Sequence, residues 1–325
     1  MASQQLFLGF DLGGTKMLAV LMDADLKVIT TAKQPTLGTQ GADEGLERML
    51  DLAAKVVSQA DAKPADITAI GVGCPGLVNP SKGILLHAPN LGWRDVPVRD
   101  AFRKSFKADV AVLNDVDAGT YGEFALGAGR GARSLLGVFP GTGVGSGFVY
   151  DGNLVMGRNV SAMELGNIYL PTAGLASKRR GAVILEDLCS RLAIASSAAV
   201  EAYRGRSPTL MEGDSLDLRN LKSKAIAKAA AADKAIERVI KNAVHHLGLG
   251  VAAAVNLLAP DRLVIGGGLA EEMPQYFVTK LRKKIKAFAM PPLFKDLEIT
   301  TATLGDNAVA VGAAAWQQHL ARHQS

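Results

Sequence analysis

The chain of 325 residues has only two cysteines, few aromatic residues and no strong excess of either charge. Cys74 and Cys189 are too few for a disulfide framework and indicate a reducing compartment, which we expect to be the cytoplasm. Aromatic residues make up 5% of the chain, and 36 basic residues face 31 acidic ones, so neither base stacking nor a basic surface argues for nucleic acid. A small anionic partner is compatible with this balance.

Long apolar runs are missing as well. The most apolar stretch, residues 247–260, is short and contains Asn256, so we expect no membrane partner. Residues 1–5 lead directly into a strand-like run, and no signal peptide is predicted. Apolar residues make up 48% of the chain and charged residues 21%, which is typical of globular proteins, and the length favours two domains.

Glycine is the residue in excess, with 35 copies that cluster after predicted strands. In the first part of the chain, apolar periodicity predicts the order βββαβαβα. A strand, a glycine turn and a second strand then recur at 135–150, followed by long helices at 182–203, 218–232 and 233–258. The recurrence predicts an α/β fold of duplicated βββαβαβα domains with a central cleft.

The run Asp11-Leu12-Gly13-Gly14-Thr15-Lys16 lies between two predicted strands. A dinucleotide fingerprint would open a helix, and the Gly-Lys pair of a Walker A loop is absent from the sequence. Glycines in a hairpin let backbone N–H groups approach an anion, so two such hairpins predict a site for a phosphate chain. Each could instead be a tight hairpin and nothing more. The candidate phosphate-binding residues are Gly13, Gly14, Thr15, Lys16, Gly141, Thr142 and Gly143.

Two further features fit a nucleotide site. Asp11 would repel phosphates, and it makes sense as a ligand of Mg²⁺ through water; the alternative is an Asx-turn that caps the hairpin. Gly266, Gly267 and Gly268 follow an apolar strand and offer a flat backbone surface for a base or ribose. A helix N-terminus packed closely on the sheet explains the three glycines equally well.

Acidic and amide side chains follow the predicted strand at 110–113. Phosphoryl transfer to an alcohol needs a carboxylate that accepts the hydroxyl proton. Asp115, which follows Asn114, lies at the carboxyl end of a predicted strand, where α/β folds bind their ligands. The alternative is an N-cap for a helix that begins near Asp117. Glu164 is suited to sugar hydroxyls, whereas Glu186 opens a helix, where an acid also stabilises the first turn.

Together these motifs resemble the ROK family of sugar kinases, within the actin-like ATPase superfamily (RNase H-like fold), over nearly the whole chain. The resemblance implies a small domain of residues 1–116 plus a returning helix at 307–325, a larger domain of residues 117–306, and a homodimer. It implies Asp115 as the catalytic base, ATP and Mg²⁺ as cofactors, and Gly266–Gly268 as the nucleotide-side loop. The implied sugar-binding residues are Gly76, Asn90, Asn114, Asp115, Glu164, Asn167 and Glu186.

The sequence departs from the family pattern in one region. Asn167 replaces the usual histidine of the E-x-G-H motif, and the zinc run C-x-C-G-x-x-G-C is absent from residues 173–185. A structural zinc site needs about four N or S ligands, so no zinc is predicted. Glu186 corresponds to the later sugar-binding glutamate of the family, although two extra residues precede it in this chain.

The resemblance therefore predicts a kinase that transfers the γ-phosphoryl group of Mg-ATP to a hexose, with the 6-hydroxyl of glucose or of a related hexose or N-acetylhexosamine as acceptor. Three alternatives stay open. One is a sugar or nucleotide binder without catalysis, and another is a glucokinase that uses polyphosphate. The third is a sugar-responsive repressor, which the start of the first strand near Phe7 disfavours because it leaves no room for a helix-turn-helix.

Overall fold

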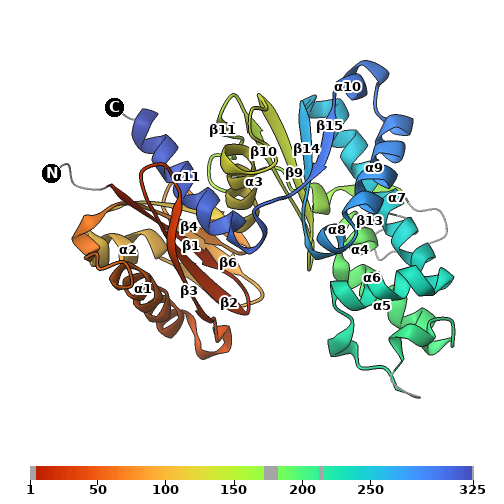
Figure 1. Cartoon of the computed structure of the whole chain (residues 1–325), viewed down its shortest axis with the longest axis horizontal. Helices are drawn as coiled ribbons and strands as arrows, with labels where there is room; N and C mark the ends of the chain where they lie inside the picture. Colours follow the sequence, from red (N-terminus) through yellow and green to blue (C-terminus); the bar gives the residue numbers. More distant parts are fainter. Residues whose placement is uncertain (1–4, 172–181, 212–214, 324–325) are drawn as a thin grey trace. The chain divides into compact units, whose positions relative to one another are not determined.

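The structure is a computed structural model that describes residues 5–171, 182–211 and 215–323. Strands and helices alternate along these residues (Figure 1). The chain divides into two units. Unit 1 contains residues 1–131, 147–163 and 303–325, and unit 2 contains residues 132–146 and 164–302. No helix within the described ranges is both long and apolar enough to cross a bilayer.

Unit 1 is built on a five-stranded sheet with the order β3-β2-β1-β4-β8. The first three strands form an antiparallel meander, and β4 and β8 run parallel to β1. This is the predicted order of the first half, with β1, β4 and β8 ending at the same edge of the sheet. The bounds are Leu6–Leu12 (β1), Lys16–Met22 (β2), Val28–Pro35 (β3), Ile67–Cys74 (β4) and Asp109–Asn114 (β8).

Helices cover both faces of this sheet. Leu8 and Phe10 of β1 belong to a core shared with α1 (Ala42–Ser58) and α2 (Val98–Phe106). Phe7, which points to the opposite face because side chains alternate along a strand, packs with residues of α11 (Ala308–His323). The sheet of unit 1 is therefore the middle of three layers (Figure 1).

Glycines permit α11 to approach unusually closely. A Cβ atom on Gly9 or Gly71, in β1 and β4, would collide with the backbone of Ala310 or Ala313. Gly122 of α3 (Asp115–Leu126) makes the same kind of contact, because its Cβ would lie 2.5 Å from the carbonyl oxygen of Ala308. Part of the glycine excess thus serves helix packing and not ligand binding.

A small sheet that the sequence did not predict follows β4. Its strands are β5 (Leu77–Asn79), β6 (Ile84–Ala88) and β7 (Trp93–Val96), in the order β5-β6-β7. The strands are only three to five residues long, which is too short for alternation to stand out. This sheet carries the candidate residues Gly76 and Asn90 in the segments beside its strands.

The second five-stranded sheet has the order β11-β10-β9-β14-β15. Its parallel strands β9, β14 and β15 pair in register, and β10 continues from unit 2 into unit 1 at Gly147. The strands are β9 (Ser134–Pro140), β10 (Val144–Tyr150), β11 (Asn153–Leu154), β14 (Arg262–Ile265) and β15 (Glu298–Thr301).

The predicted helix at 182–203 is wrong in its first part. Residues Ala182–Ile184 form strand β13, which pairs with β12 (Tyr169–Pro171), and the helix is split at Ser190 into α4 (Glu186–Cys189) and α5 (Arg191–Tyr203). Ser190 accepts a hydrogen bond from the backbone N–H of Ala193 and so caps α5. The remaining helices of unit 2 are α6 (Ser223–Ala232), α7 (Lys234–Leu258), α8 (Gly268–Glu272), α9 (Pro274–Phe288) and α10 (Pro291–Lys295).

Candidate active site

The strand ends of unit 1 bring several predicted residues into one row. Asp11 of β1 pairs with Gly73 of β4, and Cys74 pairs with Asn114 of β8. Asp115 comes next, as the first residue of α3. Since parallel strands end at the same edge, the two aspartates that were predicted for magnesium binding and for catalysis lie at one edge of the sheet, with β4 between their strands.

The electrostatics of this edge follow from partial burial. Burial raises the pKa of Asp11 to about 7, with a further increase from the Asp115 carboxylate, while Lys16 acts in the opposite direction. The pKa of the Cys74 thiol is also raised, first by burial and then by Asp115 and Asp11. Two carboxylates that oppose each other's ionisation make a favourable place for a cation.

The structure decides two of the alternatives open for these aspartates. Within the described residues, the Asp11 carboxylate accepts no hydrogen bond from the hairpin, so the Asx-turn is not formed. The N-cap of α3 is Asn114 and not Asp115, because the Asn114 side chain accepts from the N–H groups of Val116 at 2.8 Å and Asp117 at 3.3 Å. Asp115 is thus not needed as the cap.

Asn114 also links two of the predicted sugar-binding residues. Its side-chain amide donates a hydrogen bond of 3.0 Å to the carbonyl oxygen of Gly76. Gly76 has a φ of 80°, a conformation that favours glycine. The cap of α3 therefore fixes the loop between β4 and β5 beside Asp115.

The first glycine hairpin is fixed by hydrogen bonds from a residue that follows the next strand. Thr36, which is fully buried, donates its hydroxyl to the carbonyl oxygen of Gly13 at 2.7 Å, and its N–H to that of Thr15 at 3.0 Å. A Cβ on Gly13 would lie 2.5 Å from the carbonyl oxygen of Lys16, so the turn requires glycine there. Asn90 lies next to Gly14, 3.8 Å from where its Cβ would be.

In unit 2, the second glycine hairpin contacts Glu186. The Glu186 carboxylate accepts a hydrogen bond of 2.8 Å from the N–H of Val144, and it lies where a Cβ on Gly143 would be. Arg191 donates its backbone N–H to the carbonyl oxygen of Gly141 and its guanidinium to the Thr142 hydroxyl at 3.3 Å. Glu186 begins helix α4, as the sequence indicated, and the fold places it at the second glycine hairpin.

The remaining predicted sugar ligands of unit 2 lie beside the same hairpin. The side-chain amide of Asn167 donates to the Glu164 carboxylate at 3.0 Å, and both side chains are exposed. Between them, the N–H of Leu165 donates to the Ser146 hydroxyl, and Gly166 packs against Val144. Unit 2 therefore gathers Glu164, Asn167 and Glu186 around residues 143–146.

The triple glycine forms a helix start, which was one of its two interpretations. Helix α8 begins at Gly268, with Gly267 as its N-cap at φ 85°. Gly267 lies against the carbonyl group of Pro140, and Gly266 lies against the ring of Phe139. The triple glycine thus adjoins the residues that lead into the second hairpin, and a nucleotide-side role remains a prediction.

Residues 173–185, from which the zinc run of the family is absent, lie largely outside the described residues, since residues 172–181 are not described. Among the residues that are, no group of three or more His, Cys, Asp and Glu side chains is arranged to hold a metal ion. The absence of zinc stays a prediction.

Three residues make contacts at this site that the sequence did not predict. Asp306 accepts hydrogen bonds from Lys16, and Thr36 fixes the first hairpin. The buried Glu123 accepts from the N–H groups of Thr303 and Leu304, both at 2.8 Å, and so anchors the segment before Asp306. The motif Leu304-Gly305-Asp306 was visible in the sequence, whereas the contacts of Thr36 and Glu123 depend on the fold alone.

Comparison with known proteins decides the family. The model of the ROK family matches residues 7–319. The chain belongs to the ROK family. The predicted family is thereby confirmed, and so is the two-domain α/β fold class, because ROK kinases of known structure share it.

Relatives within the ROK family include enzymes and regulators. A glucokinase from Halalkalibacterium halodurans is 30% identical over 312 residues, which cover 95% of this chain and 94% of that protein. The structure of a ROK family glucokinase from Streptomyces griseus, in complex with glucose and AMPPNP, has a TM-score of 0.79 and 26% identity, covering 97% and 99% of the two chains. A xylose repressor from Caldicellulosiruptor bescii is 27% identical, covering 95% of this chain and 77% of the repressor.

Proposed function

We propose that this protein is an ATP-dependent hexose kinase. The observation that carries the proposal is the pair of carboxylates, Asp11 and Asp115, at the ends of β1 and β8. The ROK family also contains repressors, so family membership by itself leaves the activity open. A catalytic carboxylate beside a second one fit for a cation is what phosphoryl transfer requires.

Asp115 acts as the general base in this proposal. It accepts the proton of the sugar hydroxyl, whose oxygen forms a bond to the γ-phosphorus of ATP while the bond to the β-phosphate oxygen breaks and ADP leaves. The proposed sugar ligands are Gly76, Asn90, Asn114, Glu164, Asn167 and Glu186.

ATP is the proposed donor, supported by the AMPPNP complex of the Streptomyces griseus glucokinase. Backbone N–H groups of Gly13, Gly14, Gly141 and Gly143 and the hydroxyls of Thr15 and Thr142 would contact its phosphates. Lys16 adds a positive charge, and Gly266–Gly268 would adjoin the nucleoside.

Magnesium fits the donor set of unit 1. Mg²⁺ is typically held by one or two carboxylates together with water and substrate phosphates, and Asp11 provides such a carboxylate, which would hold the ion through water. Burial, and after it the charge of Asp115, raises the pKa of Asp11, and a bound cation would favour the ionised carboxylate. When bound, the ion would neutralise charge on the phosphates.

Glucose is the proposed sugar and its 6-hydroxyl the proposed acceptor, because two of the compared relatives are glucokinases. Asn167 can both donate and accept hydrogen bonds to a sugar, although it cannot provide the cation that histidine becomes. A homodimer is part of the proposal as what the resemblance to the family implies, and the cytoplasm is proposed because the chain has only two cysteines.

The test is a panel of hexoses and N-acetylhexosamines assayed for ADP release from Mg-ATP. We expect sugar-dependent ADP formation, fastest with glucose or a close relative. Calorimetry with ATP and with each sugar runs in parallel, so that binding without turnover identifies a non-catalytic binder. Replacing ATP by polyphosphate distinguishes the donors. Absence of ADP release across the panel would contradict the proposal.

A further inference from the structure

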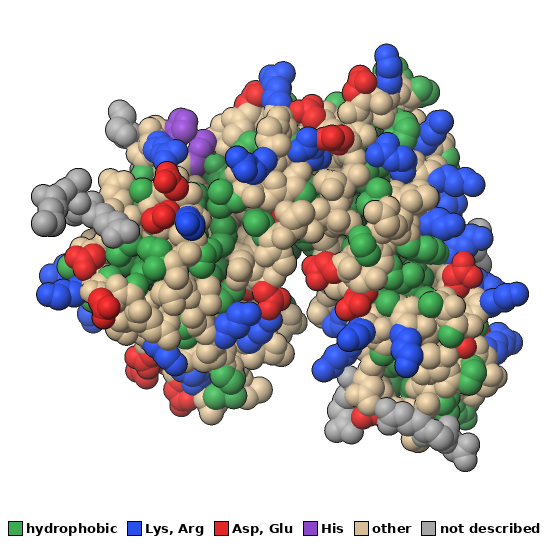
Figure 2. Space-filling view, viewed as in Figure 1, with side chains coloured by type: hydrophobic (Ala, Val, Ile, Leu, Met, Phe, Trp, Pro, Cys, Tyr) green, Lys and Arg blue, Asp and Glu red, His purple; other side chains and the backbone are tan. Residues whose placement is uncertain are grey.

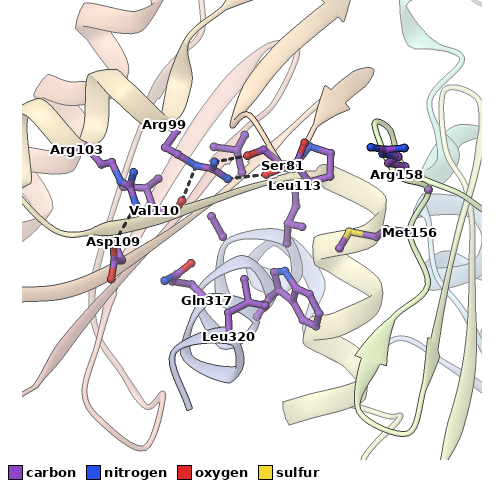
Figure 3. A pocket seen from close by; sticks show the side chains of 15 residues that line it. Ser81, Arg99, Arg103, Asp109, Val110, Leu113, Met156, Arg158, Gln317 and Leu320 are labelled. Atoms are coloured by element: carbon purple, nitrogen blue, oxygen red, sulfur yellow. Dashed lines mark hydrogen bonds and ion pairs between the residues drawn. The ribbon is translucent and has the colours of Figure 1, made fainter. Parts of the chain in front are cut away.

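A cavity of about 420 Å³ lies within unit 1 and contains none of the residues assigned to sugar or ATP. Its walls come from β8, from the turn after β5, from α11 and from the segment after β11 (Figure 3). Its volume falls in the range of small-molecule sites. The cavity adjoins Leu113, the residue before Asn114, and so borders the element that positions Asp115.

One part of the lining is apolar. Leu113 of β8, Trp316 and Leu320 of α11 and Met156 line it, and Trp316 is only 5% exposed. In Figure 3 the side chains of Leu113, Met156 and Leu320 lie around the same open space. An apolar or aromatic group would lose its contact with water here, which favours binding by about 25 cal/mol per Å² of buried apolar surface.

The charged part of the lining is dominated by arginine. Arg99, Arg103 and Arg158 line the cavity together with a single carboxylate, Asp109, which pairs with Arg103 at 3.1 Å. Arg99 is held by three backbone carbonyls, because its guanidinium donates to Pro80, Ser81 and Val110. Burial and the nearby charge of Arg103 lower the pKa of Arg99, so an anion would relieve a like-charge repulsion.

Two polar side chains at the cavity have no partner of their own. Within the described residues, Arg158 forms no hydrogen bond or ion pair, and it is exposed at the cavity. Gln317 is only 7% exposed, yet its side-chain amide has no hydrogen-bond partner in the part of the chain that the structure describes. The Gln317 amide atoms are not fully sealed from solvent, so they can bind a polar group that enters the cavity.

We propose that this cavity binds a small organic anion, a carboxylate or phosphate monoester with an apolar or aromatic body. Arg158 binds the anionic group, Arg99 and Arg103 add positive potential, and Gln317, Trp316 and Leu320 contact the body. The site is separate from the proposed kinase site and does not depend on that activity. On the face that Figure 2 shows, acidic side chains lie among the basic ones, in keeping with the modest net charge of +5, so a cavity lining with three arginines and one carboxylate is a distinct feature.

The probe is phenyl phosphate, titrated into the full chain by calorimetry and by thermal unfolding. We expect saturable binding and a rise in Tm, whereas phenol and inorganic phosphate bind at least tenfold more weakly because each offers only half of the recognised chemistry. Benzoate in the same titration shows which anionic group is preferred, and saturable binding of either anion supports the proposal. Absence of saturable binding by both anions, or equal binding of phenol, would overturn it.

Variants then locate the bound probe. Arg158→Gln should weaken phenyl phosphate binding about tenfold, the value of one charge-assisted hydrogen bond. Arg94→Gln is the matched control, because Arg94 is an exposed arginine on β7 outside the cavity. Leu320→Trp should fill the cavity and abolish binding. Unchanged binding in Arg158→Gln, or displacement of the probe by Mg-ADP or glucose, would assign it to another site.

Discussion

The ammonium group of Lys16 lies 2.7 Å from the carboxylate of Asp306, although 290 positions separate the two residues. Lys33 reaches the same carboxylate at 3.1 Å. The hydrogen bonds from Lys16 and Lys33 lower the pKa of Asp306, so this carboxylate stays ionised and holds Lys16 at the hairpin. The two lysines thus share one partner and differ in their proposed contact with ATP.

Replacement of Lys16 is expected to weaken ATP binding. Lys16→Gln should raise the KM for ATP about tenfold and leave the KM for glucose within about twofold, because a charge-assisted contact to phosphate is worth about 1.5–3 kcal/mol. Steady-state kinetics with each substrate varied in turn measures this. Lys33→Gln removes the other hydrogen bond to Asp306 and should change the KM for ATP little. Equal effects of the two variants would place the role of Lys16 in the ion pair alone.

The raised pKa of Asp11 predicts how stability changes with pH. Its folded pKa of about 7 lies above the ordinary value of 3.8, so the folded state loses stability as pH rises between these values. Asp11→Asn removes this penalty. In EDTA, we expect the gain in unfolding free energy to be about 2 kcal/mol larger at pH 8 than at pH 5. Urea unfolding at both pH values measures the difference.

The matched control for this prediction is Asp43→Asn, which changes an exposed aspartate of α1 in the same unit. Its effect on unfolding free energy should differ little between pH 5 and pH 8. An Asp11→Asn gain that is independent of pH would show that the Asp11 carboxylate is not kept from ionising in the folded protein.

Much of unit 1 could be predicted because its signals are local. Strands such as β1 are short apolar runs that are buried along nearly their whole length. The glycine turn before Lys16 and the polar pair at the end of β8 follow such runs directly. The short strand β13 could not be found, because Ala182–Ile184 is followed by residues that favour a helix and its partner β12 lies far from it in sequence. Pairing, and not propensity, makes it a strand.

The candidate site shows the same division. Asp11, Asn114 and Asp115 were predictable from their positions after strands, whereas their shared edge depends on the register of β1, β4 and β8. Glu186 was correctly predicted to begin a helix, but its hydrogen bond to Val144 arises only when α4 returns to the second hairpin. Asp306 reaches Lys16 through the placement of α11, which no local pattern encodes.

The close packing of α3 against α11 gives a test of the fold. Gly122→Ala would bring a Cβ to 2.5 Å from the Ala308 carbonyl oxygen and should destabilise the protein by about 1–3 kcal/mol. Gly119, one turn earlier in α3, has its nearest neighbour, the Cγ2 of Val309, at an ordinary 3.8 Å. Gly119→Ala should therefore be neutral or stabilising by up to about 1 kcal/mol. Similar losses of unfolding free energy in both variants would contradict this packing.

The most direct test of the central claim is the turnover of Asp115→Asn with Mg-ATP and the preferred hexose. As the proposed base, Asp115 should contribute at least about 10²-fold to kcat, while hexose binding measured by calorimetry persists and the far-UV circular dichroism is unchanged. Asp109→Asn, at the exposed start of the same strand, should keep nearly full kcat. A kcat of Asp115→Asn within a few-fold of the unmodified protein would remove Asp115 from catalysis and contradict the account.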